Sequence, residues 1–445
     1  MKRMLAYLLT AAMVISMAGC GSKKNDNTDN REQTGSEDTT QEAVAPNDGI
    51  AGSELEIAVI YTGNQAAAFQ EIVNGFEEEY GCKVHVAEYG ADYESTLKTR
   101  MASNDLPDVF MTHGWSILRY KDYLMDLREE PWVEDYDESA LGVIQDDDGS
   151  IYVMMISEGI NGTVVNKQVC DAAGVNPYDI HTWEDFTDAC ETIKAAGYTP
   201  ISVVPNPGLL ANIAGTWVSY EGSAAMDSAA MLDGSWDWES YRGLLDMYGR
   251  WIDAGYFYED IMTMNDSDLV ERYASGKAAF CLGNGPEIML TCQKLNPDSE
   301  YLFLPSFTSK EGGMEFVGIG EGGSFGIWKD TKQEAAAKVF LTYMARPENA
   351  MKMNDLTGEI SCMKPIMEVD DGYGLQVFQT MKDNCTGKIL YENLWDRKYM
   401  PSGMWPIFGN ACSMLFDNHS EAGKQEVLDY LKENYQDLYE AAKEN

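Results

Sequence analysis

The chain has 445 residues, of which 44% are hydrophobic and 11% aromatic, so it can bury a large core and is long enough for two domains. Its formal net charge of −41 at pH 7 predicts a surface that repels phosphate backbones and anionic lipid headgroups, which argues against nucleic-acid binding. An anionic ligand would need a local basic pocket, and the sequence has no cluster of Arg or Lys to form one.

The N-terminus has the features of a secretory signal. Lys2 and Arg3 precede an apolar run over residues 4–17, which is shorter than the roughly 20 residues that span a bilayer. Met17-Ala18-Gly19-Cys20 resembles the bacterial lipobox, and this resemblance implies cleavage before Cys20 and attachment of a diacylglyceryl group to its sulfur. Residues 1–19 are therefore predicted to be a lipoprotein signal peptide, in preference to an uncleaved anchor. Its removal changes the formal charge from −41 to −43, because both basic residues leave with it.

A polar stretch follows the predicted lipidation site. Residues 21–52 contain no aromatic residue and no Leu, so they cannot bury enough apolar area to offset the entropy lost on ordering. We interpret residues 20–52 as a lipidated cysteine and a disordered tether. The tether would hold the folded body, residues 53–445, on the extracytoplasmic face of the cell membrane.

The first part of the body alternates strands and helices. Apolar residues at helical spacing predict helices over 66–80 and 93–102, which separate expected strands over 55–61, 83–87 and 107–111. This order is typical of an α/β fold with parallel strands. Ligands of such sheets bind beyond the carboxyl ends of the strands, which here are Tyr61–Gln65 and Thr112–Trp115.

Strands and helices continue to alternate toward the C-terminus. Thr182 is a predicted helix cap, and Glu184 and Asp185 suit the positive end of the helix dipole. Gly283-Asn284-Gly285-Pro286 is expected to form a loop after a short buried strand. The other expected elements are extended segments over 149–155, 161–167, 199–201, 276–282 and 316–328, and helices over 182–196, 238–254, 267–275, 333–345 and 421–443.

Residue types that bind metals do not form a recognisable metal site in the sequence. The four histidines are scattered, and none of the eight cysteines after Cys20 is spaced as CxxC. Their apolar surroundings favour small buried side chains, although an extracytoplasmic protein could pair some of them. Asp146-Asp147-Asp148-Gly149 is similar to a calcium loop but lacks the alternating ligands and the distal Glu, which favours a solvated turn. No cofactor is expected.

A series of short segments along the body resembles one protein family. Each segment is a weak motif, but their order and spacing behind a lipobox are similar to the maltose-binding type of extracellular solute-binding protein (family 1), which serves carbohydrate ABC transporters. The segments are Leu106-Pro107-Asp108-Val109-Phe110, Asp148-Gly149-Ser150-Ile151-Tyr152, Val165-Asn166-Lys167, Ala173-Gly174-Val175, Thr182-Trp183-Glu184-Asp185-Phe186, Ala196-Gly197-Tyr198-Thr199-Pro200-Ile201, Ser275-Gly276-Lys277-Ala278-Ala279-Phe280, residues 332–344, and Arg346-Pro347-Glu348.

The resemblance implies an α/β fold of the periplasmic-binding-protein type II, in which two α/β lobes are joined by hinge strands and enclose a ligand cleft. It places the three hinge passages near Glu158–Asn161, Leu304-Pro305 and Ala345–Pro347. Lobe one would then comprise residues 53–160 and 305–345, and lobe two residues 161–304 and 346–445. Closure about such a hinge is a common response to a ligand.

The resemblance also implies where a sugar would bind. A sugar presents hydroxyls at its edge and C–H groups on its faces, so its site requires carboxylates, amides and aromatic rings. Asn64, Gln65 and Trp115 follow predicted strands and match family loops that contact sugar, although Trp115 could instead pack in the core. Glu158 matches a hinge carboxylate of the family, with a hinge salt bridge as the alternative. Gly323 would let the backbone approach a ligand closely.

The other candidate ligand-binding residues belong to the predicted lobe two. Trp217 matches a position near the family's cleft, and a core role fits it equally well. Asn284 matches a family loop that often continues with a sugar-stacking Trp, but this chain has Glu287 there. That departure suggests a hydrogen-bonding carboxylate or a shifted platform. Trp405, and secondarily Trp395, match an aromatic platform that the family places near the C-terminus.

The sequence thus predicts a monomeric lipoprotein that captures a saccharide and delivers it to the permease subunits of an ABC transporter. Catalysis is not expected. Gly322-Gly323-Ser324-Phe325-Gly326 matches the nucleophile elbow of hydrolases, but an extended segment rather than a helix follows Ser324, and the only downstream histidine is His419. Two alternatives stay open: a sugar-sensing lipoprotein that partners a membrane sensor kinase, and a binding protein for a non-carbohydrate solute.

Overall fold

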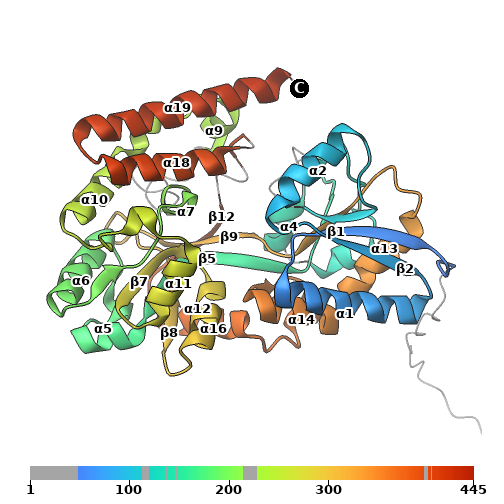
Figure 1. Ribbon diagram of the computed structural model, residues 1–445, viewed down its shortest axis with the longest axis horizontal. Helices are drawn as coiled ribbons and strands as arrows, with labels where there is room; N and C mark the ends of the chain where they lie inside the picture. The colour runs from blue at the N-terminus through green and yellow to red at the C-terminus, as the bar shows by residue number, and fades with distance from the viewer. Residues whose placement is uncertain are drawn as a thin grey trace, which may run out of the picture. The chain divides into compact units, whose positions relative to one another are not determined.

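The computed structural model of the protein describes residues 49–112, 120–136, 138–146, 148–213, 228–394, 399–401 and 403–444 (Figure 1). The signal peptide, Cys20 and most of the predicted tether lie outside these residues, as do Trp115, Trp217 and Trp395. The described residues form two β-sheets, and a separate hydrophobic core packs against each sheet.

The first sheet has the strand order β2-β1-β3-β10-β4. β1 is parallel to β2 and β3, whereas β10, from much later in the chain, is antiparallel to β3 and β4. The parallel strands confirm the α/β prediction for this part of the chain. The strands are Glu54–Val59 (β1), Lys83–Glu88 (β2), Val109–Met111 (β3), Met154–Met155 (β4) and Ser324–Ile327 (β10).

Helices α1, α13 and α14 pack together against the first sheet (Figure 1). Helix α1 buries the residues that recur every three or four positions, and Gly81 ends it with a left-handed φ of 69°. The Phe76 ring of α1 meets Phe340 of α13 edge-on, with the ring centroids 5.1 Å apart. The helices of this part are α1 (Gly63–Tyr80), α2 (Tyr93–Ala102), α4 (Glu138–Ile144), α13 (Glu334–Met344), α14 (Pro347–Thr357) and α15 (Lys364–Met367).

The second sheet is built around β5, the longest of the described strands. The order is β12-β9-β5-β7-β6, and β8 and β11 also pair with β5. The first residues of β5 pair with β9 and β11, and its last residues pair with β7 and β8. The strands are Ser157–Asn166 (β5), Thr199–Ile201 (β6), Ala278–Asn284 (β7), Tyr301–Leu304 (β8), Glu315–Glu321 (β9), Ile360–Ser361 (β11) and Ile389–Asn393 (β12).

The helix predicted after Thr182 is confirmed, with its cap. The Thr182 hydroxyl accepts from the Asp185 amide at 3.0 Å, and the Asp185 carboxylate accepts from the Thr182 amide at 2.9 Å. Phe186 then packs against the fully buried Trp251, with centroids 5.2 Å apart. The helices of this part are α5 (Lys167–Ala173), α6 (Trp183–Ala195), α7 (Pro207–Ala211), α9 (Ser228–Asp233), α10 (Arg242–Asp253), α11 (Asp266–Ala274), α12 (Pro286–Leu295), α16 (Tyr373–Asn384), α18 (Met404–Asp417) and α19 (Glu421–Glu444).

The chain passes between the two cores at places that differ in part from the prediction. The first passage lies at the start of β5, near the predicted Glu158–Asn161. The second lies between β9 and β10 rather than at Leu304-Pro305, because β9 belongs to the second sheet and β10 to the first. The last passage follows Ile366 rather than Ala345–Pro347, because Ile366 packs in the first core and Met381 in the second. Before it, the chain also touches the second core at Ile360 of β11 and then returns to the first.

The cysteines of the described residues are buried thiols rather than cross-links. All eight are free, and seven of them are buried. Burial raises the pKa of Cys170 and of Cys412 to about 12, which keeps these thiols protonated at neutral pH. Within the described ranges, no three His, Cys, Asp or Glu side chains come together as a metal site. Over the same ranges, no helix combines the length and apolar character needed to span a membrane.

Candidate functional site

The first passage between the cores carries a chain of polar contacts. The Ser157 hydroxyl, at the start of β5, donates to the Glu359 carboxylate at 2.6 Å and accepts from the Gly323 amide at 2.9 Å. The Gly322 amide donates to the Ser157 carbonyl at 2.8 Å. Three segments distant in sequence are therefore joined at one point: β5, the turn between β9 and β10, and the residue before β11.

The two glycines of this turn are required by the close packing around them. A Cβ on Gly322 would lie 2.5 Å from both the Glu359 carboxylate and the Ser157 hydroxyl. A Cβ on Gly323 would lie 3.0 Å from Ile156 and 3.3 Å from the Tyr61 hydroxyl. The sequence predicted that Gly323 lets the backbone approach a ligand closely. In the structure, the groups next to Gly323 are the side chains of Ile156 and Tyr61.

Carboxylates gather around Glu359. Glu158 and Glu321 are directly opposite each other on β5 and β9, and Ile360, which follows Glu359, pairs with Glu158 on its other side. Like charges directly opposite on neighbouring strands repel each other. Burial raises the pKa of Glu359, whereas its hydrogen bond from Ser157 lowers it. The predicted hinge carboxylate Glu158 thus lies among other acids.

Glu287 brings a further carboxylate from the second core to Glu359. It lies in the first turn of α12, where its carboxylate accepts from the Gly285 amide at 2.9 Å. The residue is exposed to solvent as a whole, yet its carboxyl group turns back over Gly285, where a Cβ would lie 2.5 Å from Oε2. Burial of the carboxyl group, with the charge of Glu359 as a smaller cause, raises the pKa of Glu287 to about 7.

Gly358 brings two helices of different cores into backbone contact. It ends α14 with a left-handed φ of 73°, and a Cβ on it would lie 3.1 Å from the Glu287 amide nitrogen. This contact fixes the position of the neighbouring Glu359 relative to α12. Of the predicted ligand-binding residues within the described ranges, the structure therefore brings Glu287 and Gly323 to Glu359, and Glu158 lies on the neighbouring strand opposite Ile360.

The other predicted site residues within the described ranges lie at helix and strand ends. Asn64 is exposed and Gln65 half-buried in the first turn of α1, just after Tyr61. Asn284 is the last residue of β7 rather than part of a loop, and its side-chain amide donates to the Leu282 carbonyl at 2.9 Å. Trp405 begins α18 with 38% of its surface exposed.

The sequence did not identify the side chains of Tyr61, Ser157 and Glu359 as candidates for the site. Tyr61 and Ser157 lie within segments that the pattern did predict to be near a ligand or a hinge. Glu359 lies in a part of the chain for which no element was predicted, so only its contacts in the fold reveal it.

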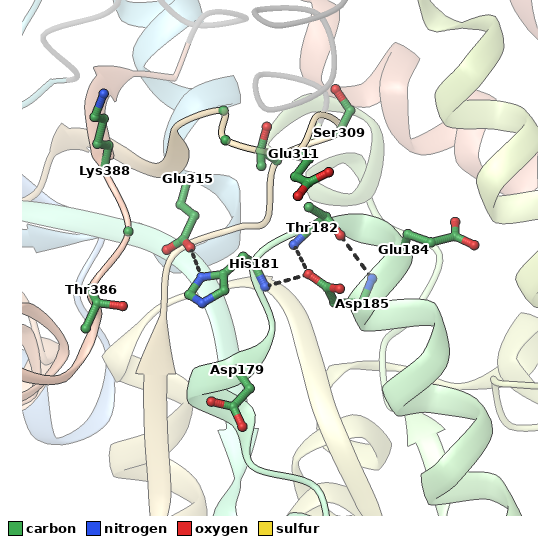
Figure 2. Close-up of a pocket in the computed structure, with 14 residues that line it drawn as sticks. Asp179, His181, Thr182, Glu184, Asp185, Ser309, Glu311, Glu315, Thr386 and Lys388 are labelled. Carbon is green, nitrogen blue, oxygen red and sulfur yellow. Dashed lines mark hydrogen bonds and ion pairs between the residues drawn. The ribbon is translucent and has the colours of Figure 1, made fainter.

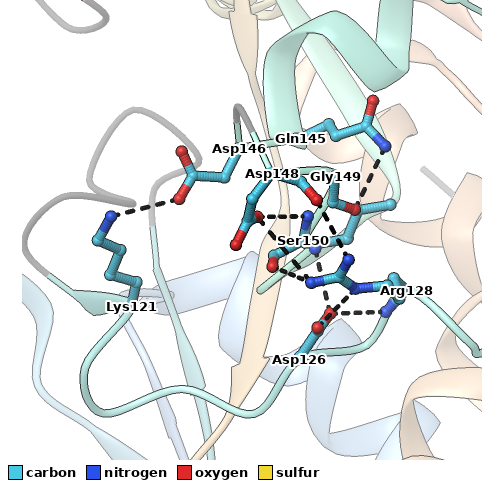
Figure 3. Close-up of polar contacts among 9 residues, drawn as sticks. Lys121, Asp126, Arg128, Gln145, Asp146, Asp148, Gly149 and Ser150 are labelled. Atoms are coloured by element: carbon cyan, nitrogen blue, oxygen red, sulfur yellow. Dashed lines mark hydrogen bonds and ion pairs between the residues drawn. The ribbon is translucent and has the colours of Figure 1, made fainter.

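The acidic turn around Asp148 is held by cations and amides of the protein itself (Figure 3). The Ser150 amide donates to the Asp148 carboxylate at 2.9 Å, and Arg128 lies 3.9 Å from it. Lys121 pairs with Asp146 at 3.3 Å. Asp147 lies outside the described residues. These contacts fit the predicted solvated turn better than a calcium loop.

A cavity of about 800 Å³ opens elsewhere, beside the start of α6 (Figure 2). On its wall, the His181 ring nitrogen Nδ1 lies 2.5 Å from the Glu315 carboxylate, which is only 4% exposed. Among the residues that the structure describes, no predicted site residue lines this cavity, and its described lining has no Trp, Tyr or Phe against which a sugar face could pack.

The predicted nucleophile pattern does not form an elbow. Ser324 is fully buried as the first residue of β10, and it pairs with Met155 in an antiparallel ladder. β10 continues through Ile327 without a helix following the serine. A hydrolase elbow requires a strand before the serine and a helix directly after it.

Comparisons with known proteins agree with the fold. Residues 62–351 match the family model of the bacterial extracellular solute-binding protein. The chain is 28% identical over 361 residues to the melibiose/raffinose/stachyose-binding protein MelE of Bacillus subtilis (strain 168), which covers 78% of this chain and 81% of MelE.

Two solved structures are similar over nearly the whole body. The binding protein MsmE of Bacillus subtilis in an open conformation has a TM-score of 0.77 and 26% identity, over 88% of this chain and 99% of that one. A sugar transporter of Bacillus licheniformis in complex with stachyose has a TM-score of 0.73 and 26% identity, over 86% and 100% of the two chains.

This chain belongs to the family of bacterial extracellular solute-binding proteins. It has the two-lobed α/β fold of type II periplasmic binding proteins, as the sequence predicted. The family consists of extracytoplasmic binding proteins, which agrees with the prediction that the chain is not an enzyme.

Proposed function

We propose that this protein captures a neutral oligosaccharide of the melibiose, raffinose and stachyose kind at its hinge and delivers it to an ABC permease. The observation that carries the proposal is the convergence of Glu287 and Gly323 on Glu359, from segments far apart in the sequence, with Glu158 on the neighbouring strand. Carboxylates and backbone groups suit sugar hydroxyls. MelE, a relative aligned over most of both chains, is a binding protein for these three sugars.

The charge of the protein supports a neutral ligand. The formal net charge is −41, and the residues near Glu359 at the hinge add carboxylates rather than cations. An anionic solute would meet repulsion both at long range and at contact. Hydroxyl groups, in contrast, can donate to carboxylates without bringing any charge.

Thermal unfolding with added solutes tests the ligand class. A ligand that binds only the folded state stabilises it, by about 2.7 kcal/mol at a hundredfold excess over Kd. We expect at least one of melibiose, raffinose and stachyose to raise the unfolding temperature. Inorganic phosphate and an acidic peptide serve as controls. Stabilisation by a control solute and by none of the three sugars would contradict the proposal.

Trp405 is proposed as an aromatic platform for the sugar face. Its exposed ring at the start of α18 could pack on C–H groups without first leaving a core. We expect Trp405→Ala to weaken raffinose binding at least tenfold in titration calorimetry, which is about 1.4 kcal/mol. Leu295→Ala, at the exposed end of α12, is the matched control and should bind as the wild type does. Equal affinities of the two variants would remove Trp405 from the site.

Lipid anchoring at Cys20 and delivery to permease subunits belong to the same proposal. The support is the lipobox-like Met17-Ala18-Gly19-Cys20 and the membership of the family. We expect Cys20→Ser to move the protein from the membrane fraction to the medium. Deletion of the gene should abolish uptake of labelled raffinose. Normal uptake together with a lost transcriptional response to the sugar would instead indicate a sensing role.

A further inference from the structure

The Tyr61 side chain differs in its hydrogen bonding from the buried tyrosines Tyr136 and Tyr248. It follows β1, is 4% exposed and packs on Phe69 with ring centroids 5.7 Å apart. Its hydroxyl is buried and has no hydrogen-bond partner. By comparison, the hydroxyl of Tyr136 donates to the Met155 carbonyl at 2.7 Å, and that of Tyr248 donates to the Leu209 carbonyl at 2.9 Å.

A buried hydroxyl without a hydrogen-bond partner destabilises the ligand-free protein, and a ligand that supplies a partner removes this cost. Leaving such a group unsatisfied costs about 1–3 kcal/mol. Ligand binding that supplies a partner therefore gains this energy in addition to the contact itself. Burial raises the pKa of Tyr61, and the charge of Glu359 raises it further, so the phenol keeps its proton and acts as a donor.

Glu359 supplies the matching acceptor close to this donor. Gly322 lies against the Glu359 carboxylate and the next residue, Gly323, lies against the Tyr61 hydroxyl, so one dipeptide separates the two groups. Ser157 holds the carboxylate in place through the 2.6 Å bond. Since neither glycine carries a side chain, no Cβ stands between the phenol and the carboxylate at these two positions.

Building on the proposed function, we propose that Tyr61 and Glu359 together recognise two neighbouring hydroxyls of the saccharide. The phenol donates to one hydroxyl oxygen, and the carboxylate accepts from the other hydroxyl. A vicinal diol provides both an acceptor and a donor on adjacent carbons, whereas an anion would be repelled by the carboxylate. Tyr61 and Glu359 are therefore determinants of specificity for a polyhydroxylated neutral ligand.

Tyr61→Phe tests the donor in two independent measurements. Removal of an unpartnered hydroxyl breaks no bond in the ligand-free protein, so its unfolding temperature should stay the same or rise. Raffinose affinity in titration calorimetry should fall about tenfold. The matched control is Tyr136→Phe, which loses the bond to Met155 and should unfold at a lower temperature while its affinity stays unchanged.

Glu359→Gln tests the acceptor, because the amide keeps the size of the side chain and its carbonyl can still accept from Ser157. Raffinose affinity should again fall about tenfold. Unchanged affinity in both site variants would overturn the inference, as would a lowered unfolding temperature of ligand-free Tyr61→Phe, which would mean that the phenol is already bonded. If wild-type protein binds none of melibiose, raffinose and stachyose, the proposed function fails instead.

Discussion

The Ser157 hydroxyl donates a 2.6 Å hydrogen bond to the Glu359 carboxylate across 202 positions of sequence. The same hydroxyl accepts from the Gly323 amide, so one small side chain satisfies two groups. Ser157 begins the strand that leaves the first core, and Glu359 precedes the strand that pairs beside it. This relationship makes Ser157 a structural centre of the hinge, and its removal has a measurable consequence.

Ser157→Ala should lower the free energy of unfolding by about 1–3 kcal/mol, because it removes the hydroxyl that donates to a half-buried carboxylate and accepts from a buried amide. Urea denaturation at neutral pH measures this loss. The matched control is Ser240→Ala, which removes an exposed hydroxyl bonded to Asp237 and should change stability by less than about 0.5 kcal/mol. Equal effects of the two variants would mean that the hinge bond adds no stability.

Gly358→Ala should destabilise the protein more than Gly174→Ala does. Both glycines end a helix with a left-handed φ, of 73° and 75°, so alanine pays a similar backbone penalty of about 1 kcal/mol at each. Only the Cβ on Gly358 would make a tight contact with backbone, at 3.1 Å from the Glu287 amide nitrogen; nothing lies within 4 Å of the Cβ on Gly174. We expect an additional loss of at least about 1 kcal/mol in urea denaturation. If the two variants lose nearly the same stability, α12 can shift away from the new methyl group without a loss of free energy.

Stability should decrease between about pH 4.5 and pH 7 in a way that depends on Glu287. Its pKa of about 7 in the folded protein lies above the ordinary 4.5, so the folded state keeps a proton that the unfolded state releases. This stabilisation is complete below pH 4.5 and is lost as the pH rises through 7. Glu287→Gln should therefore match the wild type in unfolding temperature at pH 5 and exceed it at pH 8. An exposed glutamate of α19 provides the control, Glu433→Gln, which should follow the wild type at both pH values.

The cap of α6 can be tested by two threonine variants with opposite expected signs. Thr182→Ala removes the acceptor for the Asp185 amide and should cost about 1 kcal/mol in urea denaturation. Thr192→Ala lies in the exposed part of the same helix, where alanine has the higher helix propensity, and should be neutral or slightly stabilising. A loss of stability in Thr192→Ala equal to that in Thr182→Ala would contradict the capping role.

Helices with clear local signals, such as apolar spacing, a capping residue or a terminal glycine, were predicted from the sequence. The spacing of apolar residues and Gly81 placed most of α1 and its end, and Thr182 with Asp185 placed the start of α6. The start of α12 was predicted to be a loop, although proline at the first helical position is a known start signal. The two later passages between the cores were predicted at the wrong residues. Their positions depend on which core each segment packs in, and no local sequence pattern specifies that.

The hinge site was predictable only in part for the same reason. Glu158, Glu287 and Gly323 could be selected because the family resemblance covers their segments. Glu359 could not, since its role arises from contacts with Ser157 and Gly322 that link distant parts of the chain. The lack of a hydrogen-bond partner for the Tyr61 hydroxyl likewise depends on the three-dimensional positions of its neighbours, so the sequence could not predict it.

The eight unpaired thiols of the described residues have a consequence for how the exported chain matures. No covalent bond between these side chains has to form, break or exchange before the native packing is reached. Renaturation from urea should therefore proceed equally fast with and without a chemical oxidant, and the chain can acquire its structure in an anoxic environment without a disulfide-forming enzyme.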